Sequence, residues 1–112
     1  MGYDAFYNMI GIGAKAGKYV YGTYAVKTHI RNGKIDLALI DGSASGNLKK
    51  TIQDSCTYYE TACIVLREND VLSKRVGRDI KVLGVRDKQF SAVLKNKYRE
   101  VSDRISGGEA NI

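Results

Sequence analysis

Apolar residues recur along this chain with two different periods. In the first segment they lie at Phe6, Ile10 and Ala14, one helical turn apart, which is typical of one face of an α-helix. Elsewhere they form short unbroken runs bounded by turn residues, such as DLALI at 36–40, which are typical of buried strands. The pattern therefore predicts helices over residues 4–15, 22–31, 47–59, 68–76 and 87–102, and strands over 18–21, 36–40, 62–66 and 81–86.

The order of these elements points to one layered domain. Because the predicted strands are apolar on both faces, they need helices on both sides of the sheet. The alternation of helices and strands then predicts an α/β fold, a three-layer α/β/α sandwich. A length of 112 residues fits one domain, which we place at residues 1–105. The segment 106–112 is rich in glycine and polar residues, and we interpret it as a flexible tail.

Two further signals bear on how the helices begin and pack. Asp87 is expected to cap the last helix. The loop DGSASG at 41–46 opens onto the third helix, where exposed backbone N–H groups would suit an anion. The other interpretation of this loop is a helix capped by Ser45 or Asn47.

The inner face of the last helix is predicted to hold Phe90, Val93, Leu94, Tyr98 and Val101.

The cysteines and the histidine do not form a recognisable metal site. Cys56 and Cys63 are spaced neither as a zinc-binding pair nor as a redox pair. With His29 as the single histidine, too few ligands remain for a Cys/His site. We interpret both cysteines as buried, reduced and structural, which points to a reducing cytoplasm. No stretch has the apolar length of a membrane span, and the start lacks the pattern of a secretory signal.

Candidate catalytic motifs are weak. The stretch GIGAKA at 11–16 matches the dinucleotide fingerprint, but it lies at the end of a predicted helix rather than between a strand and a helix. His29 falls on the apolar side of its helix, as a structural histidine does. Asp36 and Asp41 lie at opposite ends of one strand, too far apart to share a proton. We therefore expect no enzymatic activity and no cofactor.

The net charge and the positions of the basic residues indicate which class of partner the protein binds. The formal net charge is +6 and the sequence pI is about 9.4, which favours a polyanionic partner. Thr23, Lys27 and Arg31 recur every four residues and so share one stripe of the second helix. The second basic group surrounds the turn after the fourth helix and consists of Lys74, Arg75, Arg78 and Lys81. If the two groups meet, they form a phosphate-binding surface; otherwise they are solvated faces.

Several short marks then follow one another in a fixed order between residues 6 and 98. They are Ala16-Gly17-Lys18 before Gly22-Thr23, Ala44-Ser45 with Asn47 and Lys49-Lys50, Cys56, and Leu72 with Gly77. In this order and spacing they resemble the ribosomal L-seven-Ae family of kink-turn RNA-binding proteins, in particular its bacterial YlxQ-like subgroup. The resemblance implies an α/β/α sandwich with a four-stranded mixed sheet. It also implies an RNA site at the start of the second helix and the turn after the fourth.

The chain departs from the family pattern at the positions that read RNA. Typical members follow the Gly-Thr pair with Asn-Glu, which contact the sheared G·A pairs of the kink, whereas this chain has Tyr24 and Ala25. The family's lysine six residues after the glycine is Thr28 here, and the positive charge stands at Lys27 instead. Ala25 offers no donor or acceptor to a base edge. Tyr24 is either a platform for an unpaired base or a residue of the core or its margin.

The sequence thus predicts a cytoplasmic, non-enzymatic RNA-binding protein, associated with the ribosome or translation, that contacts structured, kink-turn-like RNA without metal or membrane. The alternative is a structural or protein-interaction module of the same fold that has lost specific RNA readout. The residues expected to contact RNA are Lys18, Gly22, Thr23, Tyr24, Lys27, Arg31, Arg78 and Lys81.

Overall fold

A computed structural model of the chain describes residues 4–67, 71–102 and 109–111. Helices and strands alternate through the chain, as predicted. The helices are α1 (Asp4–Lys15), α2 (Thr23–Arg31), α3 (Gly46–Tyr58), α4 (Leu72–Val76) and α5 (Lys88–Ser102). The strands are β1 (Tyr19–Tyr21), β2 (Leu37–Ile40), β3 (Ala62–Val65), β4 (Val82–Val85) and β5 (Glu109–Asn111).

The strands form one mixed sheet in the order β1-β4-β2-β3-β5. β2 and β3 run parallel, and β4 runs antiparallel to both of its neighbours, β1 and β2. β4 lies between β1 and β2, which are both far from it in the chain. Close packing explains the glycine at position 84 of β4. A Cβ at position 84 would lie 2.6 Å from Cδ1 of Ile35, so a larger residue would displace that side chain. The four strands predicted from sequence are confirmed.

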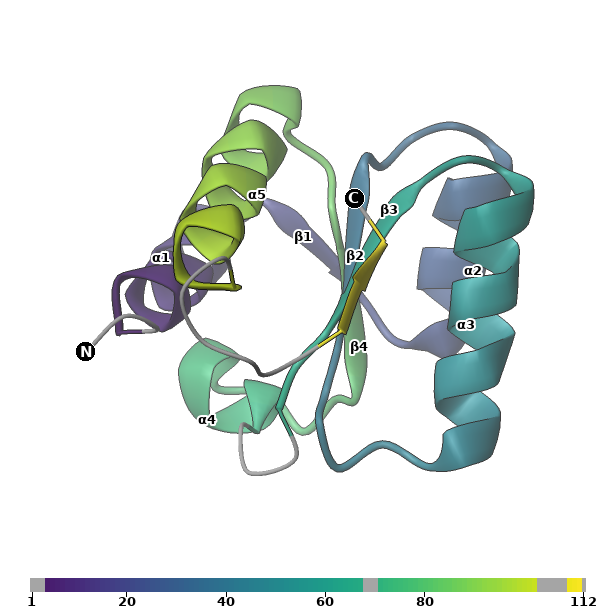
Figure 1. Cartoon of the computed structure of the whole chain (residues 1–112), viewed down its shortest axis with the longest axis horizontal. Coiled ribbons are helices and arrows are strands. Elements are labelled where there is room, and N and C mark those ends of the chain that lie inside the picture. Colours follow the sequence, from purple (N-terminus) through teal and green to yellow (C-terminus); the bar gives the residue numbers. More distant parts are fainter. Residues whose placement is uncertain (1–3, 68–70, 103–108, 112) are drawn as a thin grey trace.

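Helices cover both faces of this sheet, which confirms the three-layer sandwich. Figure 1 shows α2 and α3 on one side of the sheet and α1, α4 and α5 on the other. The side chains of β2 alternate accordingly. Leu37 and Leu39 join the core beneath α1, α4 and α5, whereas Ala38 and Ile40 join the core beneath α2 and α3.

The glycine-rich stretch at 11–16 lies within and just after α1, and its second glycine serves packing. A Cβ at Gly13 would lie 2.2 Å from the Tyr19 hydroxyl oxygen. That hydroxyl donates a hydrogen bond of 2.7 Å to the Ile10 carbonyl oxygen. Burial raises the pKa of the Tyr19 phenol well above its ordinary range, so this donor keeps its proton. Gly13 therefore allows α1 to pack closely against Tyr19 of β1, and it does not belong to a nucleotide-binding loop.

Several smaller expectations are confirmed. Asp87 caps α5, because its Oδ1 accepts a hydrogen bond of 2.9 Å from the Phe90 backbone N–H. Ser45 caps α3 by accepting from the Leu48 backbone N–H at 3.1 Å, which favours the capping interpretation of the 41–46 loop. Cys56 and Cys63 are both buried, and half-buried His29 has Nδ1 2.8 Å from the Ala25 carbonyl oxygen.

Three expectations are corrected. Residues 109–111 are not part of a flexible tail: as β5 they pair antiparallel with β3, whose outer edge otherwise leaves backbone groups unpaired. Residues 106–108 and 112 lie outside the described residues. The fourth helix, predicted over 68–76, begins at Leu72, because Val71 has an extended backbone. Residues 68–70 lie outside the described residues. Val93 is 39% exposed and lies at the edge of the buried stripe of α5.

Candidate nucleic-acid interface

The strand register defines two ends of the sheet. At one end Ile40 pairs with both Val82 and Val65, so the chain leaves β2 and β3 and enters β4 there. The start of α2 lies at this same end, because the Gly22 backbone N–H donates to the Val82 carbonyl oxygen at 3.1 Å. In Figure 1 this is the lower end of the sheet, where α2 and α3 begin and where α4 leads into β4.

We call this end the rim and define it by the sequence-predicted residues that it brings together, plus one more. Two of the predicted residues come from the turn between α4 and β4, and the others come from the start of α2 and its first turn. The additional residue belongs to the loop after β2. The rim consists of Gly22, Thr23, Tyr24, Lys27, Ser43, Arg78 and Lys81.

A buried carboxylate holds the rim together. Asp41 follows β2 and is fully buried. Its Oδ1 accepts from both the backbone N–H and the hydroxyl of Ser43, each at 2.7 Å, and its Oδ2 accepts from the Leu72 backbone N–H at 2.9 Å. A buried charge is stable only when such donors satisfy it. Asp41 therefore fixes the loop after β2 against the first turn of α4.

Lys81 is positioned by the same network although its side chain is exposed. Its Nζ donates to the Ser43 hydroxyl oxygen at 2.9 Å, and its carbonyl oxygen accepts from the Asp41 backbone N–H at 2.8 Å. The Ser43 hydroxyl thus accepts from an ammonium while donating to a carboxylate. The neutral hydroxyl oxygen of Ser43 therefore holds the Lys81 ammonium at the surface, where it can meet an anion.

Arg78 is held in a different way. Its guanidinium carbon lies 4.4 Å from the centre of the half-buried Tyr21 ring, within the range of a cation–π contact. The ring restricts the long side chain without neutralising it. Arg78 and Lys81 therefore both present charge beside the start of α2.

The start of α2 adds a backbone feature. Gly22 has φ 94° and ψ 154°, a conformation that side chains strongly disfavour, and it offers no side chain to cap the helix. The positive end of the helix dipole is therefore close to Arg78 and Lys81. Thr23 is exposed, and Tyr24 is 83% exposed. Tyr24 is thus not a core residue, and its ring faces solvent.

Two predicted residues lie away from the rim. Lys18 precedes β1 at the other end of the sheet, and its Nζ lies 2.7 Å from Oδ2 of Asp87 in an ion pair. Arg31 ends α2, about 12 Å along the helix axis from Thr23. Lys27 is one turn from the helix start, about half that distance away. The expected meeting of the two basic groups is therefore wrong for Arg31, whereas for Lys27 it stays a prediction.

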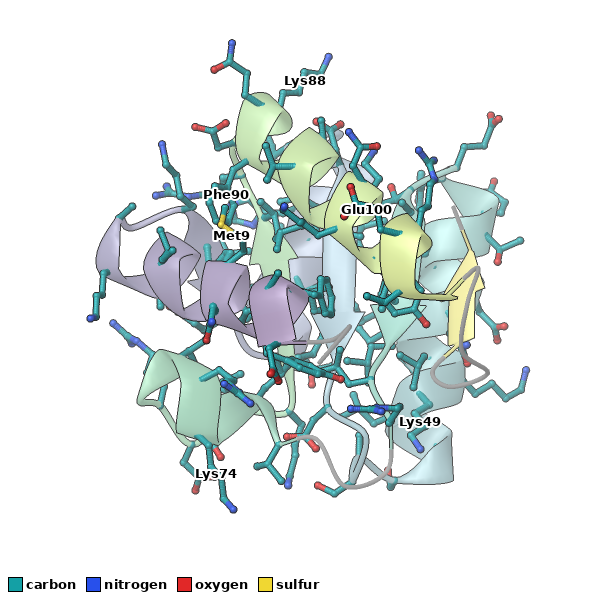
Figure 2. All side chains as sticks on the ribbon, turned by 60° about the vertical axis from the view of Figure 1, so that its left-hand side comes forward. Met9, Lys49, Lys74, Lys88, Phe90 and Glu100 are labelled. Carbon is teal, nitrogen blue, oxygen red and sulfur yellow. The ribbon has the colours of Figure 1, made fainter. Side chains whose placement is uncertain are left out.

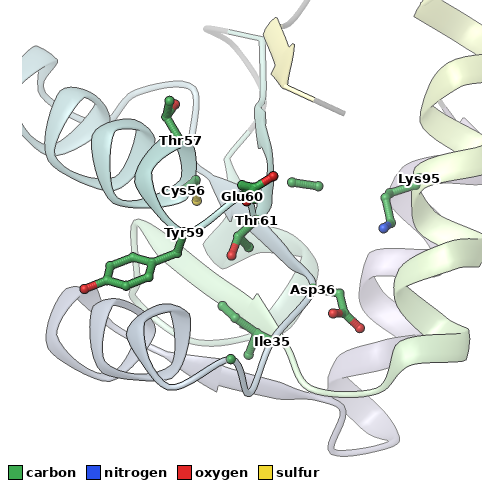
Figure 3. A pocket seen from close by; sticks show the side chains of 10 residues that line it. Ile35, Asp36, Cys56, Thr57, Tyr59, Glu60, Thr61 and Lys95 are labelled. Atoms are coloured by element: carbon green, nitrogen blue, oxygen red, sulfur yellow. The ribbon is translucent and has the colours of Figure 1, made fainter.

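The opposite end of the sheet, which we call the far end, has mixed charge. Here Leu37 pairs with Val85 and Ala62, and both α2 and α3 end. A hollow of about 560 Å³ lies there, with Asp36, Glu60 and Lys95 among its lining residues (Figure 3). The Lys18–Asp87 pair lies at the same end, since Tyr19 also pairs with Val85.

Sequence reasoning missed Asp41, Ser43 and Tyr21 as residues that position the rim. The Asp-Gly-Ser order does carry a signal, because an aspartate commonly accepts a hydrogen bond from the residue two positions on. The bond from Leu72 spans 31 residues, and the Arg78–Tyr21 contact joins separate elements. No local pattern indicates either of them.

Within the described residues, no group of three or more His, Cys, Asp or Glu residues lies close enough together to hold a metal ion. None of the described helices is both long and apolar enough to cross a membrane.

No family model matches this chain, but solved structures and curated proteins are similar to it. Two solved structures share its fold. A protein of unknown function from Bacillus halodurans superposes with a TM-score of 0.77 at 26% identity, over 85% of this chain and 97% of that one. The 15.5 kD RNA-binding protein of Giardia lamblia superposes with a TM-score of 0.65 at 13% identity, over 88% and 86% of the two chains.

Two curated proteins are similar in sequence. RNA-binding protein YlxQ of Enterococcus faecium is 33% identical over 88 residues, which cover 79% of this chain and 85% of the relative. RNA-binding protein YlxQ of Bacillus subtilis is 30% identical over 90 residues, covering 80% and 90%. Identity at this level across most of both chains shows common descent, so this chain belongs to the YlxQ family.

Proposed function

We propose that this protein binds structured RNA through the rim. The observation that carries the proposal is the junction of the α2 start with Arg78 and Lys81, two cations held in place by Tyr21 and by the Ser43–Asp41 network. Exposed cations beside a helix start suit a phosphate backbone. The names of the two curated relatives, both called RNA-binding proteins, support the same function.

The rim chemistry favours phosphate contacts and stacking over base-edge readout. Thr23 and the cations Lys27, Arg78 and Lys81 are suited to phosphates. Ala25 has no group that reads a base edge, whereas the exposed ring of Tyr24 suits stacking on an unpaired base. We therefore propose an RNA with a sharp bend and an unpaired base, such as a kink-turn, rather than a regular duplex.

The test is binding to a kink-turn RNA and to a plain duplex of equal length, measured across a range of salt concentrations. We expect tighter binding to the kink-turn and a log–log salt slope of about −0.7 to −0.9 for each phosphate contacted. Absence of binding at micromolar protein would contradict the proposal, as would an affinity independent of salt.

A matched pair of variants locates the surface. Arg78→Ala/Lys81→Ala removes two cations from the rim, and Lys88→Ala/Lys95→Ala removes two from α5. Figure 2 shows Lys88 at the opposite end of the molecule from Lys74 of α4. The rim variant is expected to bind about tenfold or more weakly with a shallower salt slope, while the α5 variant stays close to wild type. Equal losses would show that only total charge matters.

Tyr24 separates stacking from charge. Tyr24→Ala is expected to lower the kink-turn affinity by about tenfold without changing the salt slope, because base–aromatic stacking carries no net charge. Tyr24→Phe keeps the ring and is expected to retain most of the affinity. If Tyr24→Phe binds the RNA as weakly as Tyr24→Ala, the hydroxyl group rather than the ring makes the contact.

We also propose that the bound RNA belongs to the ribosome or its assembly, in the cytoplasm, and that the protein is a binding module rather than an enzyme. Sedimentation of a cell extract is expected to place the protein with ribosomal particles and to release it after ribonuclease treatment. Retention in a heavy fraction after that treatment would favour the protein-interaction alternative. A nucleotide-dependent rise in thermal stability of several degrees would instead favour a nucleotide-binding role.

A further inference from the structure

A second basic surface adjoins the rim on the other side of β1. α1 and α4 pack against each other, and a groove of about 900 Å³ lies between them. Figure 2 shows α4 alongside α1, with Lys74 on its outer side. Side chains of α1, of α4 with the turn after it, and Tyr21 of β1 line the groove.

The side chains of this groove carry charge of one sign. Lys15, Lys74, Arg75 and Arg78 line it, and no aspartate or glutamate does so within the part of the chain that the structure describes. Ile12 adds an apolar surface there, since it is 51% exposed. A groove with four cations and an exposed apolar side chain fits a ligand that is both anionic and flat-faced.

Two of these cations are held against aromatic rings. The guanidinium carbon of Arg75 lies 5.1 Å from the centre of the Tyr7 ring, as that of Arg78 lies over Tyr21. Tyr7 is buried, so its ring supports Arg75 from beneath, and Arg75 itself is exposed. A guanidinium fixed in this way offers a flat cationic surface on which a base can stack.

The close packing of the two helices gives the groove a rigid floor. A Cβ at Gly11 would lie 3.2 Å from the Arg75 carbonyl oxygen, tighter than ordinary contact. Glycine at this position therefore lets the backbone of α4 approach α1. The stretch of α1 from Tyr7 to Lys15 spans about 12 Å, so the groove holds a short segment of RNA. A base that stacks on Arg75 must be unpaired, and the groove therefore suits an unpaired strand.

Arg78 belongs to both surfaces, because it lines the groove and also stands in the rim. We propose that unpaired nucleotides flanking a structured RNA pass Arg78 and enter the α1–α4 groove. There Lys15 and Lys74 contact phosphates, and a base stacks on Arg75 beside Ile12. This inference rests on the proposed function, since the structured part of the RNA occupies the rim.

The experiment compares two forms of one kink-turn RNA, with and without a short unpaired extension at either strand end. The extension is expected to tighten binding by about tenfold, the effect of one well-stacked base. It should also steepen the salt slope by about 0.7 for each added phosphate contact. A duplex extension of equal charge should add less, because its bases are paired and cannot stack on Arg75.

Variants assign the effect to the groove. Lys15→Ala/Lys74→Ala removes two exposed cations that no described ion pair uses, and it is expected to abolish the gain from the extension while leaving the affinity for the minimal RNA unchanged. Arg75→Ala is expected to do the same, with thermal unfolding used to check that α4 stays packed on α1. The matched control is Lys88→Ala/Lys95→Ala, which should keep the full gain.

The possible outcomes separate this inference from the proposed function. If the minimal RNA binds but the extension adds nothing, the groove proposal is overturned and the rim proposal stands. If the extension tightens binding equally in the wild type and in both groove variants, the groove is again excluded. If neither RNA binds, the rim proposal itself fails. If the extension adds nothing, but an acidic peptide binds the wild type and not the groove variants, the groove is a protein site and the proposal is overturned.

Discussion

The two ends of the sheet contain similar side chains but arrange them differently. At the rim the fully buried carboxylate of Asp41 accepts hydrogen bonds from backbone and serine donors, and the cations Arg78 and Lys81 are exposed. At the far end Lys18 is bonded to Asp87, and Arg86 donates to the Gly17 carbonyl oxygen at 2.8 Å. Lys18 and Asp87 thus neutralise each other at the far end, whereas Arg78 and Lys81 at the rim contact a neutral ring and a neutral hydroxyl and can meet an anionic partner.

Chain direction strengthens this difference. α2 and α3 both begin at the rim and end near the hollow that Asp36, Glu60 and Lys95 line (Figure 3). Helix starts carry partial positive charge and helix ends partial negative charge. α2 and α3 therefore add partial positive charge at the rim and partial negative charge at the far end, where α5 begins at Lys88 and adds partial positive charge of its own. The direction of α2 and α3 thus favours the rim for an anionic partner.

The largest expected effect comes from Asp41, the carboxylate that organises the rim. Asp41→Asn places an amide N–H₂ against donors that now meet a carboxylate, so a buried donor loses its partner. We expect the free energy of unfolding to fall by about 2 kcal/mol or more. RNA affinity should fall as well, because Ser43 and Lys81 lose their support. Chemical denaturation and RNA titration measure the two effects.

The control for Asp41 is Asp54, which is exposed on α3 and forms an ion pair with Lys50 at 2.9 Å. Asp54→Asn should change stability by no more than about 0.5 kcal/mol, because exposed pairs contribute little. If the two variants lose equal stability, Asp41 does not have the organising role assigned to it.

The next effect concerns the backbone at the start of α2. Gly22→Ala forces a side chain into φ 94°, at a cost of about 1–3 kcal/mol, and displaces the first turn of the helix. Gly46→Ala at the start of α3 is the matched control, since both sites have open space around an added Cβ and Gly46 has no positive φ. Gly46→Ala is expected to be neutral or stabilising. Comparing the thermal unfolding of the two variants separates the effect of backbone strain from that of the added methyl group.

A smaller effect is expected at the far end, in acid. The hydrogen bond from Lys18, followed by that from the Phe90 N–H, holds the pKa of the Asp87 carboxyl below its usual value. A depressed folded pKa stabilises the protein above the unfolded value of about 3.9, and the contribution disappears as the pH falls through the folded pKa. Asp87→Asn should therefore reduce the loss of stability below that pH. RNA affinity at neutral pH should not change.

The smallest expected effect tests the sign of charge at the rim. Asp79 is exposed in the same turn as Arg78 and Lys81. Asp79→Asn removes its negative charge within a Debye length of the bound phosphates, and we expect RNA to bind about twofold more tightly at low salt. The gain should vanish at high salt. A weaker complex would mean that Asp79 itself contacts the RNA.

Local patterns were sufficient for the elements and for part of the site. The helical spacing in α1 and the apolar run of β2 place those elements to within a residue. Residues that face the core recur with the period of the element that carries them, so the apolar pattern marks its bounds. Charge alone marks Arg78 and Lys81, whereas the resemblance to the L-seven-Ae family implies a site at the start of α2, where Gly22 and Thr23 lie. Their contact with RNA stays a prediction. Lys18 was also predicted on charge, but its partner Asp87 lies 69 residues away, and no local signal shows that contact.

Long-range contacts account for the remaining differences. The pairing of 109–111 with β3 depends on an edge elsewhere in the chain, and a segment rich in glycine and polar residues does not look like a strand. The start of α4 is determined by Asp41, 31 residues earlier, rather than by its own cap. The support of Arg78 by Tyr21 likewise requires two elements to be placed first.

The most direct measurement is a titration of isotope-labelled protein with kink-turn RNA, followed by the backbone amide signals in an NMR spectrum. Our account predicts that the largest shifts occur around 22–27, 41–45 and 77–81. Those around 33–36, 57–61 and 86–88 should stay nearly constant. If the strongest shifts instead surround Asp36, Glu60 and Lys95, RNA occupies the wrong end of the sheet and the central claim is refuted.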